Sequence, residues 1–577
     1  MHQKTPLGLH LWQRIADLGV SSIFGVPGDM NLELLDYIDE VKGLSWVGTA
    51  NELGAAYAAD GYCRVKQCPG VIVTTMGVGE LSAINGVAGA FTEQVKLIHI
   101  VGTTATSAQK KNLMIHHCLG PSPDHRVYDK ISRSVRTTHC WLDDISTAQT
   151  EIDRVLDACL FLSLPVYIFV PMDFVHQPLP PRESSTPPAL SRPLASDTSL
   201  VLHYALSAIY TAKRPVVIVD ALVARHGASN KLRHLLDVLK FPTFCTPMGK
   251  GIVNEDKGYF YGVYNGRVSH PGVVEVVESS DLLLDFGPLH SDSNTGGHSR
   301  AIRTETTIAS MPFGVVMRGR LFTEVELGEF LSLLIERIDR SKIPAVPQPR
   351  MPNLEAVSDG SEIISQSWIW RRIGDFLKPK DIVIVESGTA QFGFSDVNFP
   401  PDLLYITQIY YGSIGYATPA CLGAAVARRD QNDSPNGRVI LVVGDGSLQL
   451  TAQEVGTMVK LGLDNILILV LNNNGYTIER AIHGPTKGYN DIAAWNWQLM
   501  LSFFGHKNGA ESSRVARTKA ELERILGSIE YVSPRSLQLL EIHMAKMDVP
   551  WRLRAQISII EARMKRGLRE NGDLSGE

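Results

Sequence analysis

The sequence has few of the features that place a protein in a membrane or on a nucleic acid. Its most apolar stretches, such as Ile466–Leu471 and Val439–Val443, are about as long as buried strands and far shorter than the roughly 18 residues that span a bilayer. The N-terminal residues are typical of an amphipathic helix rather than of a secretion signal. The sequence has 55 lysine and arginine residues and 60 aspartate and glutamate residues, which gives a formal net charge of −5. That charge is too small to drive binding to nucleic acid or a membrane surface, and we expect neither partner.

Cysteine is also scarce. The sequence has seven cysteines, an odd number, without a C-x-x-C pair: Cys63, Cys68, Cys118, Cys140, Cys159, Cys245 and Cys421. This pattern argues against a disulfide framework and against a structural zinc site, and it is typical of a reducing compartment. We therefore expect a cytoplasmic protein.

What the sequence does have is an ordinary globular composition, with 44% hydrophobic and 20% charged residues, which excludes a disordered or collagen-like chain. At 577 residues, the chain has room for three or four domains. Two proline-rich stretches, 179–193 and 342–353, predict extended linkers, because proline at that density cannot continue a helix or an inner strand. They leave blocks at 1–178, 194–341 and 354–550, followed by a tail at 551–577.

Each block alternates short apolar runs with helical stretches. The runs predict strands at Ile23–Val26, Val71–Thr75, Leu97–Val101, Pro215–Val219, Leu282–Phe286, Ile382–Val385, Val439–Val443 and Ile466–Leu471. Short buried strands separated by helices are typical of parallel sheets covered by helices. The fold class that we predict is α/β, with three consecutive doubly wound parallel-sheet domains.

The strongest chemical signal lies in the third block, where polar clusters follow two predicted strands. Gly444-Asp445-Gly446 ends the first strand, a helix is expected from about Ser447, and Asn472-Asn473-Asn474-Gly475 ends the second. A right-handed crossover brings the carboxyl ends of such strands to one edge of the sheet, so Asp445 can approach Asn473. Carboxylate, amide and main-chain oxygens suit Mg²⁺, and a glycine-rich helix N-terminus suits a phosphate.

Each cluster alone would more often be a tight turn or a strand-end loop, and it is their pairing across one βαβ unit that indicates a site. A nicotinamide dinucleotide is the other candidate ligand. No G-x-G-x-x-G follows Val443, and no acidic residue closes the second strand. The sequence therefore favours a metal-bound diphosphate.

The paired clusters resemble the diphosphate and Mg²⁺ signature of thiamine diphosphate (ThDP) enzymes. The longer stretch GDGSLQLTAQE…NNNGYTIE is similar to the 2-oxo acid decarboxylases related to pyruvate decarboxylase. Further stretches match this family in the expected order: FGVPGDMNLELLD, GTANELGAAYAADGYCR, HHCLG, SDSNTGG, ESGTAQFG and YGSIGYATPACLGAA. The resemblance covers nearly the whole chain and implies a pyrimidine-binding domain (1–178), a central domain (194–341) and a diphosphate-binding domain (354–550).

The resemblance implies how the diphosphate end of the cofactor is held. Asp445, Asn473 and the Gly475 carbonyl resemble the Mg²⁺ ligands. Gly446 and Ser447 follow Asp445 at the start of the helix and would contact the diphosphate.

At the other end, Ile414 resembles the apolar residue that props the cofactor into a bent shape, and Thr389 and the Gly412 carbonyl would contact the aminopyrimidine. Glu52 resembles the glutamate that promotes the imino tautomer of that ring, which takes the proton from thiazolium C2. We expect a poorly solvated Glu52 carboxylate with a raised pKa, because Leu53 and several alanines surround it in the sequence. On local sequence alone, Glu52 is simply a helix-start carboxylate.

Four titratable residues resemble the acid–base set of these decarboxylases: Asp29, His116, His117 and Glu479. Histidines and closely spaced carboxylates suit the proton transfers that decarboxylation needs. Adjacent histidines are otherwise common as surface or capping residues. A zinc site is disfavoured, because neighbours in sequence tend to point apart and no companion ligand is spaced nearby.

In the family, Glu52 and the histidine pair come from one subunit, and Asp445 and Glu479 from another. The resemblance therefore implies a homodimer with active sites at the interface, and two such dimers pairing into a tetramer.

The function that we predict is non-oxidative decarboxylation of a small 2-oxo acid, with pyruvate as the expected substrate, through a ThDP carbanion and an enamine. Leu222 stands where substrate-activated members carry a cysteine, so a thiol-dependent activation is not expected. His298 and Tyr411 stand where phenylalanine and tryptophan are familiar. They leave an aromatic 2-oxo acid decarboxylase or an acyloin-forming carboligase as alternatives. A non-catalytic homologue is disfavoured, because every matched catalytic position is filled.

The tail places Leu553, Ile557, Ile560 and Met564 on one helical face among basic residues. A basic amphipathic helix can bind membranes, but we favour packing over the active-site entrance.

Overall fold

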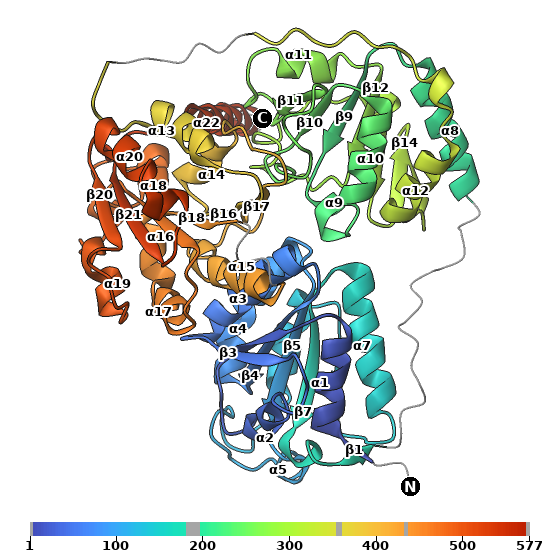
Figure 1. The fold of residues 1–577 in the computed structure, drawn as a ribbon. Helices are drawn as coiled ribbons and strands as arrows, with labels where there is room; N and C mark the ends of the chain where they lie inside the picture. The colour runs from blue at the N-terminus through green and yellow to red at the C-terminus, as the bar shows by residue number, and fades with distance from the viewer. Residues whose placement is uncertain (1–3, 180–196, 353–359, 432–436, 573–577) are drawn as a thin grey trace.

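The structure is a computed structural model that describes residues 4–179, 197–352, 360–431 and 437–572. Figure 1 shows three domains, each built on one sheet of six or seven strands. All of the strands predicted from apolar runs form, with ends within two residues of the predicted ones. The predicted α/β class and three-domain architecture are confirmed, while the limits of the three blocks stay predictions.

The two predicted linkers are described only in part. The stretch 179–193 lies, apart from Leu179, outside the described residues. Within the stretch 342–353, residues 343–352 form neither helix nor strand, and residue 353 is not described.

The first domain has a parallel sheet in the order β3-β2-β4-β5-β7-β6. Its strands are β2 (Ser22–Gly25), β3 (Ser45–Gly48), β4 (Gly70–Thr75), β5 (Leu97–Thr103), β6 (Thr138–Trp141) and β7 (Val166–Pro171). Its helices are α1 (Leu7–Asp17), α2 (Leu32–Asp36), α3 (Glu52–Lys66), α4 (Val78–Thr92), α5 (Thr106–Lys110), α6 (Val127–Ser132) and α7 (Ala148–Leu162). The short strands β1 (Thr5–Pro6) and β8 (Pro178–Leu179) pair separately. The inner strands β4, β5 and β7 are buried along their whole length, as strands covered on both faces are.

The central sheet is mixed, which differs from the prediction of a wholly parallel one. Its order is β11-β10-β9-β12-β13-β14-β15, and β14 and β15 run antiparallel to their neighbours. The β14–β15 turn is Arg318-Gly319, where both residues have positive φ, 49° and 75°. This is the geometry that tight hairpins favour, so the chain folds back at once without a crossover helix.

The central domain is built from short strands and helices, like the first domain. The strands are β9 (Pro215–Val219), β10 (Thr243–Cys245), β11 (Phe260–Val263), β12 (Leu282–Phe286), β13 (Thr307–Met311), β14 (Gly314–Met317) and β15 (Arg320–Thr323). The helices are α8 (Thr198–Thr211), α9 (Leu222–Arg225), α10 (Ser229–Leu239), α11 (Val273–Glu278) and α12 (Leu327–Arg337).

The third sheet is parallel, in the order β17-β16-β18-β19-β21-β20. Its strands are β16 (Ile382–Val385), β17 (Leu404–Ile406), β18 (Val439–Gly444), β19 (Ile466–Asn472), β20 (Ser513–Ala516) and β21 (Gln538–His543). Its helices are α13 (Gln366–Phe376), α14 (Thr389–Phe394), α15 (Ala417–Asp430), α16 (Asp445–Thr451), α17 (Gln453–Lys460), α18 (Thr477–Ile482), α19 (Met500–Phe503), α20 (Lys519–Leu526) and α21 (Ile529–Val532). Because β16, β18 and β19 are adjacent and parallel, their carboxyl ends share one edge of the sheet.

Helices α3 and α15 join the first domain to the third, and they lie side by side (Figure 1). One hydrophobic core runs through both domains, whereas the central domain has a separate core. The backbones of the two helices touch: a Cβ added at Gly61 would overlap the Ala420 carbonyl, and one added at Gly423 would overlap the Ala58 carbonyl. Small residues are therefore required along this contact.

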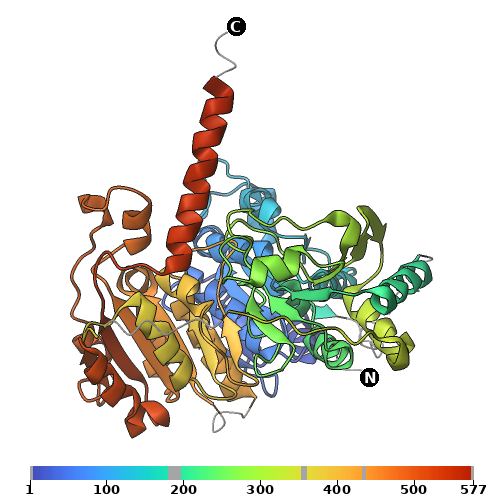
Figure 2. The ribbon, with the colours of Figure 1, turned by 90° about the horizontal axis from the view of Figure 1, so that it is seen from above.

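Helix α22 (Trp551–Gly572) closes the chain. At its start, Arg552 Nε donates to Asp396 Oδ1 at 2.6 Å and Trp551 Nε1 donates to Asp396 Oδ2 at 2.7 Å. Figure 2 shows its far end projecting away from the three domains. Among the residues that the structure describes, no helix combines the length and apolar character needed to cross a membrane.

We expect Gly423→Ala to lower the free energy of unfolding by about 1–3 kcal/mol, because the added methyl group would force α3 and α15 apart. Alanine's higher helix propensity would act in the opposite direction by about 1 kcal/mol at most. Thermal and urea unfolding measure the change. Gly258→Ala is the matched control, since nothing lies within 4 Å of a Cβ added there. Equal effects of the two substitutions would contradict the contact.

Candidate active site

The carboxyl edge of the third sheet gathers polar side chains from three neighbouring strands. Glu386 follows β16, Asp445 follows β18 and Asn473 follows β19. Because these strands are parallel and adjacent, the three residues meet at one edge. The predicted approach of Asp445 to Asn473 is present in the structure.

Three oxygen-bearing groups converge at this edge. One end of the Asn473 amide lies 2.9 Å from the Gly475 carbonyl oxygen and 3.2 Å from Asp445 Oδ1. With the amide oxygen at that end, three acceptors face one another with no hydrogen between them, which is how ligands surround a cation. With the NH₂ group at that end, the same atoms would be hydrogen bonded instead. The residues present therefore fit a cation with oxygen ligands.

The loop after β19 is shaped for this convergence. Asn474 and Gly475 both have positive φ, 60° and 116°, a region that asparagine and glycine enter most readily. The Gly475 N–H donates to Asp445 Oδ2 at 3.1 Å, and the Gly446 N–H donates to Oδ1 at 2.9 Å. Burial raises the pKa of Asp445 to about 6 despite these hydrogen bonds. A bound cation would favour the charged carboxylate again.

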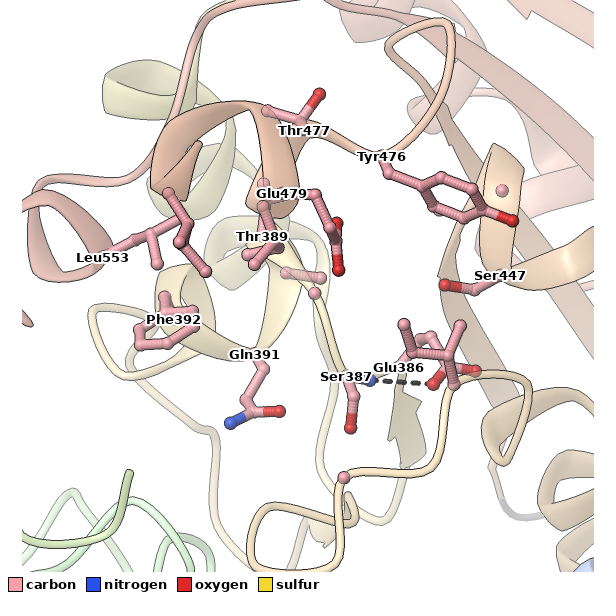
Figure 3. Close-up of a pocket in the computed structure, with 18 of the residues that line it drawn as sticks. Glu386, Ser387, Thr389, Gln391, Phe392, Ser447, Tyr476, Thr477, Glu479 and Leu553 are labelled. Atoms are coloured by element: carbon pink, nitrogen blue, oxygen red, sulfur yellow. Dashed lines mark hydrogen bonds between the residues drawn. The ribbon is translucent and has the colours of Figure 1, made fainter. Parts of the chain in front are cut away.

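A cavity of about 620 Å³ opens above this edge (Figure 3). It is lined by all of the predicted site residues of the third domain: Thr389, Gly412, Ile414, Asp445, Gly446, Ser447, Asn473, Gly475 and Glu479. Helix α16 begins at Asp445, two residues before the predicted start, because Gly444 is extended and ends the strand. Glu479 lies in the first turn of α18, and Figure 3 shows its carboxyl group pointing into the cavity.

Helix α22 lines the same cavity. Leu553, Ile557 and Ile560 of its apolar face are among the lining residues, whereas the side chain of Met564 lies outside the described ones. In the described part of the helix, the apolar face is thus turned to the site, as the favoured interpretation of the tail expects.

Sequence reasoning missed Glu386, which is buried in the cavity wall with 1% of its surface exposed. Its Oε1 accepts from the Ser387 N–H at 2.9 Å and its Oε2 from the Ala417 N–H at 3.0 Å. Its two hydrogen bonds therefore connect the turn before Thr389 to the segment after Ile414. Burial raises the pKa of Glu386 to about 7, although these hydrogen bonds act in the opposite direction. Its place directly after a strand, like that of Asp445, is the signal that could have found it.

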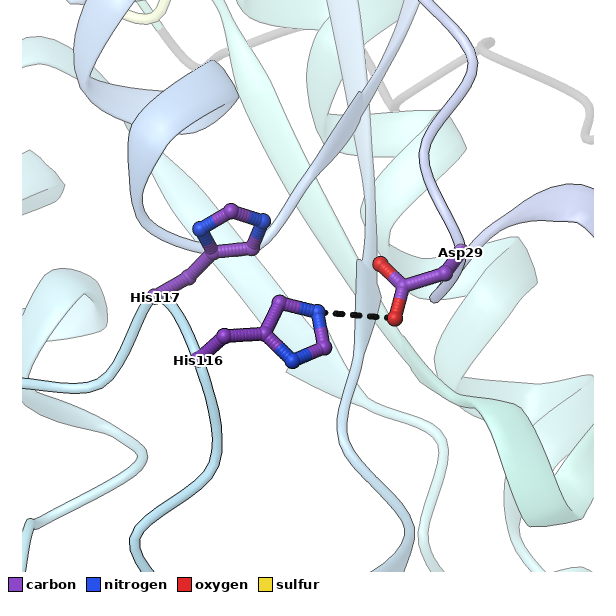
Figure 4. A group of neighbouring side chains, drawn as sticks. All are labelled: Asp29, His116 and His117. Carbon is purple, nitrogen blue, oxygen red and sulfur yellow. Dashed lines mark ion pairs between the residues drawn. The ribbon is translucent and has the colours of Figure 1, made fainter.

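The predicted residues of the first domain form a second group, shown in Figure 4. His116 Nε2 lies 2.8 Å from Asp29 Oδ2, and the His116 and His117 rings are 4.6 Å apart. We call Asp29, His116 and His117 the histidine cluster. The expectation that adjacent histidines point apart is wrong here. His117 has a positive φ of 70°, and this left-handed kink turns both rings toward Asp29.

Glu52 is the first residue of α3, so it lies at the positive end of that helix. The Asn51 side chain accepts from the Leu53 N–H at 2.8 Å, and Glu454 Oε1 of α17 accepts from the Ala50 N–H at 3.2 Å. Glu52 is partly exposed in the single chain rather than enclosed as predicted, because it stands at the open end of the helix. Neither Glu52 nor the histidine cluster is among the described residues that line the cavity.

The chain matches three family models in succession. Residues 7–125 match the thiamine pyrophosphate enzyme N-terminal TPP-binding domain, residues 202–312 the central domain, and residues 386–533 the C-terminal TPP-binding domain. The three matches fall on the three sheets in order.

Curated relatives match nearly the whole chain. Pyruvate decarboxylase from Kluyveromyces lactis is 42% identical over 563 residues, and that from Candida glabrata is 41% identical over 558 residues. Pyruvate decarboxylase isozyme 1 from Saccharomyces cerevisiae is 40% identical over 560 residues. Each match covers 96% of this chain and 98% of the relative.

We expect Glu386→Gln to change how stability depends on pH. Between its ordinary pKa of 4.5 and about 7, the folded protein keeps the Glu386 proton that the unfolded chain releases. The carboxyl group therefore makes the free energy of unfolding fall as pH rises through this window, and glutamine removes that dependence. Glutamine has one acceptor oxygen for two N–H groups, so the variant should be less stable at pH 4.5 by about 1–3 kcal/mol.

Urea unfolding at several pH values measures the difference between the parent and the variant. That difference should shrink as pH rises toward 7. Glu511→Gln, at an exposed position of the same domain, is the control and should show no such trend. A constant difference for Glu386→Gln across the window would contradict the prediction.

Proposed function

The chain belongs to the thiamine diphosphate-dependent 2-oxo acid decarboxylases, and from this premise we propose that it converts pyruvate to acetaldehyde and CO₂. The oxygens of Asp445, Asn473 and Gly475 converge in a cavity that also receives the carboxyl group of Glu479. A cation–diphosphate site and a proton donor in one cavity are what cofactor-dependent decarboxylation requires.

When bound, ThDP supplies the nucleophilic carbon and the electron sink for breaking a carbon–carbon bond. Mg²⁺ would bind the oxygens of Asp445, Asn473 and Gly475, and the start of α16, where Gly446 and Ser447 line the cavity, would hold the diphosphate. Toward the ring end, the cavity wall supplies Thr389, Gly412 and Ile414. Glu386 fixes the two segments that carry these residues.

Glu479 is the group that we propose moves protons inside the cavity. It is partly buried, at the first turn of α18. Its carboxyl group can donate a proton to the carbonyl oxygen of the substrate and accept one when the aldehyde leaves. The apolar residues of α22 and Ile414 border the same space and would exclude water while CO₂ departs.

We further propose that the active enzyme is a homodimer, with two dimers pairing into a tetramer. In the single chain, the histidine cluster is not among the described residues that line the cavity of Glu479. Apolar side chains are exposed beside both groups: Leu113, Met114 and Leu119 near the cluster, and Ile482 and Tyr489 near Glu479. Pairing two chains would bury these side chains and complete each site with groups from both subunits.

The two departures from the family pattern give little support to an aromatic substrate. Tyr411 is turned away to Asn85, to whose Oδ1 its hydroxyl donates at 2.9 Å. His298 is exposed, and its carbonyl accepts from Arg563 at 2.5 Å. Neither side chain lines the cavity in the described chain, so we propose pyruvate rather than a bulky 2-oxo acid.

A cytoplasmic location is also proposed. All seven cysteines carry free thiols in the structure, which suits a reducing compartment.

A panel of 2-oxo acids from pyruvate to phenylpyruvate, supplied with ThDP and Mg²⁺, tests the proposed function. We expect pyruvate to give acetaldehyde and CO₂ with the highest kcat/KM. Asp445→Ala is the control, because loss of a cation ligand should abolish both ThDP retention and CO₂ release. Faster turnover of phenylpyruvate, or acyloin as the main product, would favour one of the alternatives. Failure to release CO₂ from any substrate with ThDP bound would overturn the proposal.

Subunit exchange between two inactive variants tests whether each active site contains residues from both subunits. Glu52→Gln and Glu479→Gln should each retain ThDP and lower kcat by about 10²–10⁴-fold, because each loses a group that moves or directs a proton. After subunit exchange between the two variants, roughly a quarter of the parent activity should return, because about half of the dimers are mixed and each mixed dimer has one intact site. Each variant exchanged with itself is the control. No recovery after demonstrated exchange would place both residues in the site of a single chain.

A further inference from the structure

We propose that the histidine cluster is a binding site for a divalent transition metal such as Zn²⁺. One ligand atom from each of Asp29, His116 and His117 lies within 4.8 Å of the other two. The site offers two imidazole nitrogens and one carboxylate oxygen. It is separate from the oxygen site at Asp445, which lies in the third domain.

The backbone holds the three side chains near one another. The positive φ at His117 turns both rings to one side, and the Tyr128 hydroxyl donates to the His117 carbonyl at 2.6 Å, which fixes the kink. Asp29 comes from the loop between β2 and α2, and its carboxylate already bonds His116 Nε2 at 2.8 Å. The cluster is therefore largely assembled before any ion arrives.

The ligand atoms can close on an ion with small movements. Bonds of about 2.0–2.2 Å to a tetrahedral ion place neighbouring ligand atoms about 3.3–3.6 Å apart. The ligand atoms all lie within 4.8 Å of one another, so no spacing has to shrink by more than about 1.5 Å, which a rotation of the side chains supplies. The side chains of His116 and Asp29 are 57% and 55% exposed in the single chain, so their own domain does not block an ion from them.

The chemistry of the ligands selects the metal. Imidazole nitrogen binds Zn²⁺, Co²⁺, Ni²⁺ and Cu²⁺ far better than it binds Mg²⁺, which prefers oxygen. Two histidines and one carboxylate also leave coordination positions open for water or a substrate carboxylate. The protein therefore has two sites of opposite preference, with Mg²⁺ on the oxygens near Asp445 and a transition metal on the histidine cluster.

Metal binding at the histidine cluster would inhibit decarboxylation. This consequence rests on the proposed function. A metal on these atoms takes the lone pairs that the cluster would use to accept protons. Zn²⁺ should therefore inhibit decarboxylation reversibly, while ThDP and Mg²⁺ stay bound.

The test titrates the ThDP- and Mg²⁺-loaded protein with Co²⁺, followed by visible absorption, and then displaces Co²⁺ with Zn²⁺ in a calorimeter. We expect one transition-metal ion per chain at constant ThDP content. His117→Ala should weaken this binding at least about 100-fold, since it removes a direct ligand. His176→Ala is the matched control. His176 Nε2 lies 3.2 Å from Glu33 Oε2, but this pair has a single imidazole, so its loss should leave the binding unchanged.

Thermal unfolding of both variants without metal checks that they remain folded. Absence of Co²⁺ and Zn²⁺ binding in the parent, or unchanged binding in folded His117→Ala, would overturn the metal site. Metal binding needs no turnover, so a protein that binds Zn²⁺ at the cluster but decarboxylates nothing would refute only the proposed function. Binding without any inhibition of an active enzyme would overturn the stated consequence.

Discussion

The close approach of α3 and α15 is the constraint on which the site depends. Gly61 and Gly423 let each helix rest against the other's carbonyl oxygens, so the distance between the first and third domains is set by backbone contact. Both helices begin at or close to residues of the proposed site. Helix α3 starts at Glu52, and α15 follows the segment of Gly412 and Ile414. A rigid contact between the helices therefore fixes how far apart these two segments lie in one chain.

Two buried carboxyl groups complete this framework by bonding main-chain N–H groups rather than cationic side chains. Glu386 accepts from the N–H groups of Ser387 and Ala417 in the third domain. Glu454 of α17 accepts from the N–H group of Ala50 in the first domain. Burial raises the pKa of each to about 7. Buried acids are costly, and here each satisfies N–H groups at a strand end or helix start that would otherwise lack partners.

The sequence was most informative where backbone rules alone decide the outcome. Buried strands have continuous apolar runs, and the right-handed crossover brings Asp445 to Asn473 whatever the side chains between them. It was least informative where a single φ angle decides. The kink at His117 and the hairpin turn at Arg318-Gly319 depend on backbone states that neighbouring residues leave open. Glu386 was missed because one acidic residue after a strand forms no motif until its neighbours in space are known.

The backbone of the loop after β19 has a consequence for how the proposed cation site takes up its ion. Asn474 and Gly475 have positive φ angles, and the N–H groups of Gly475 and Gly446 donate to the two carboxylate oxygens of Asp445. These hydrogen bonds fix the Asp445 carboxylate beside the Gly475 carbonyl before any ion is present. Ion uptake at these residues then needs no refolding of the loop, because the position is preorganised.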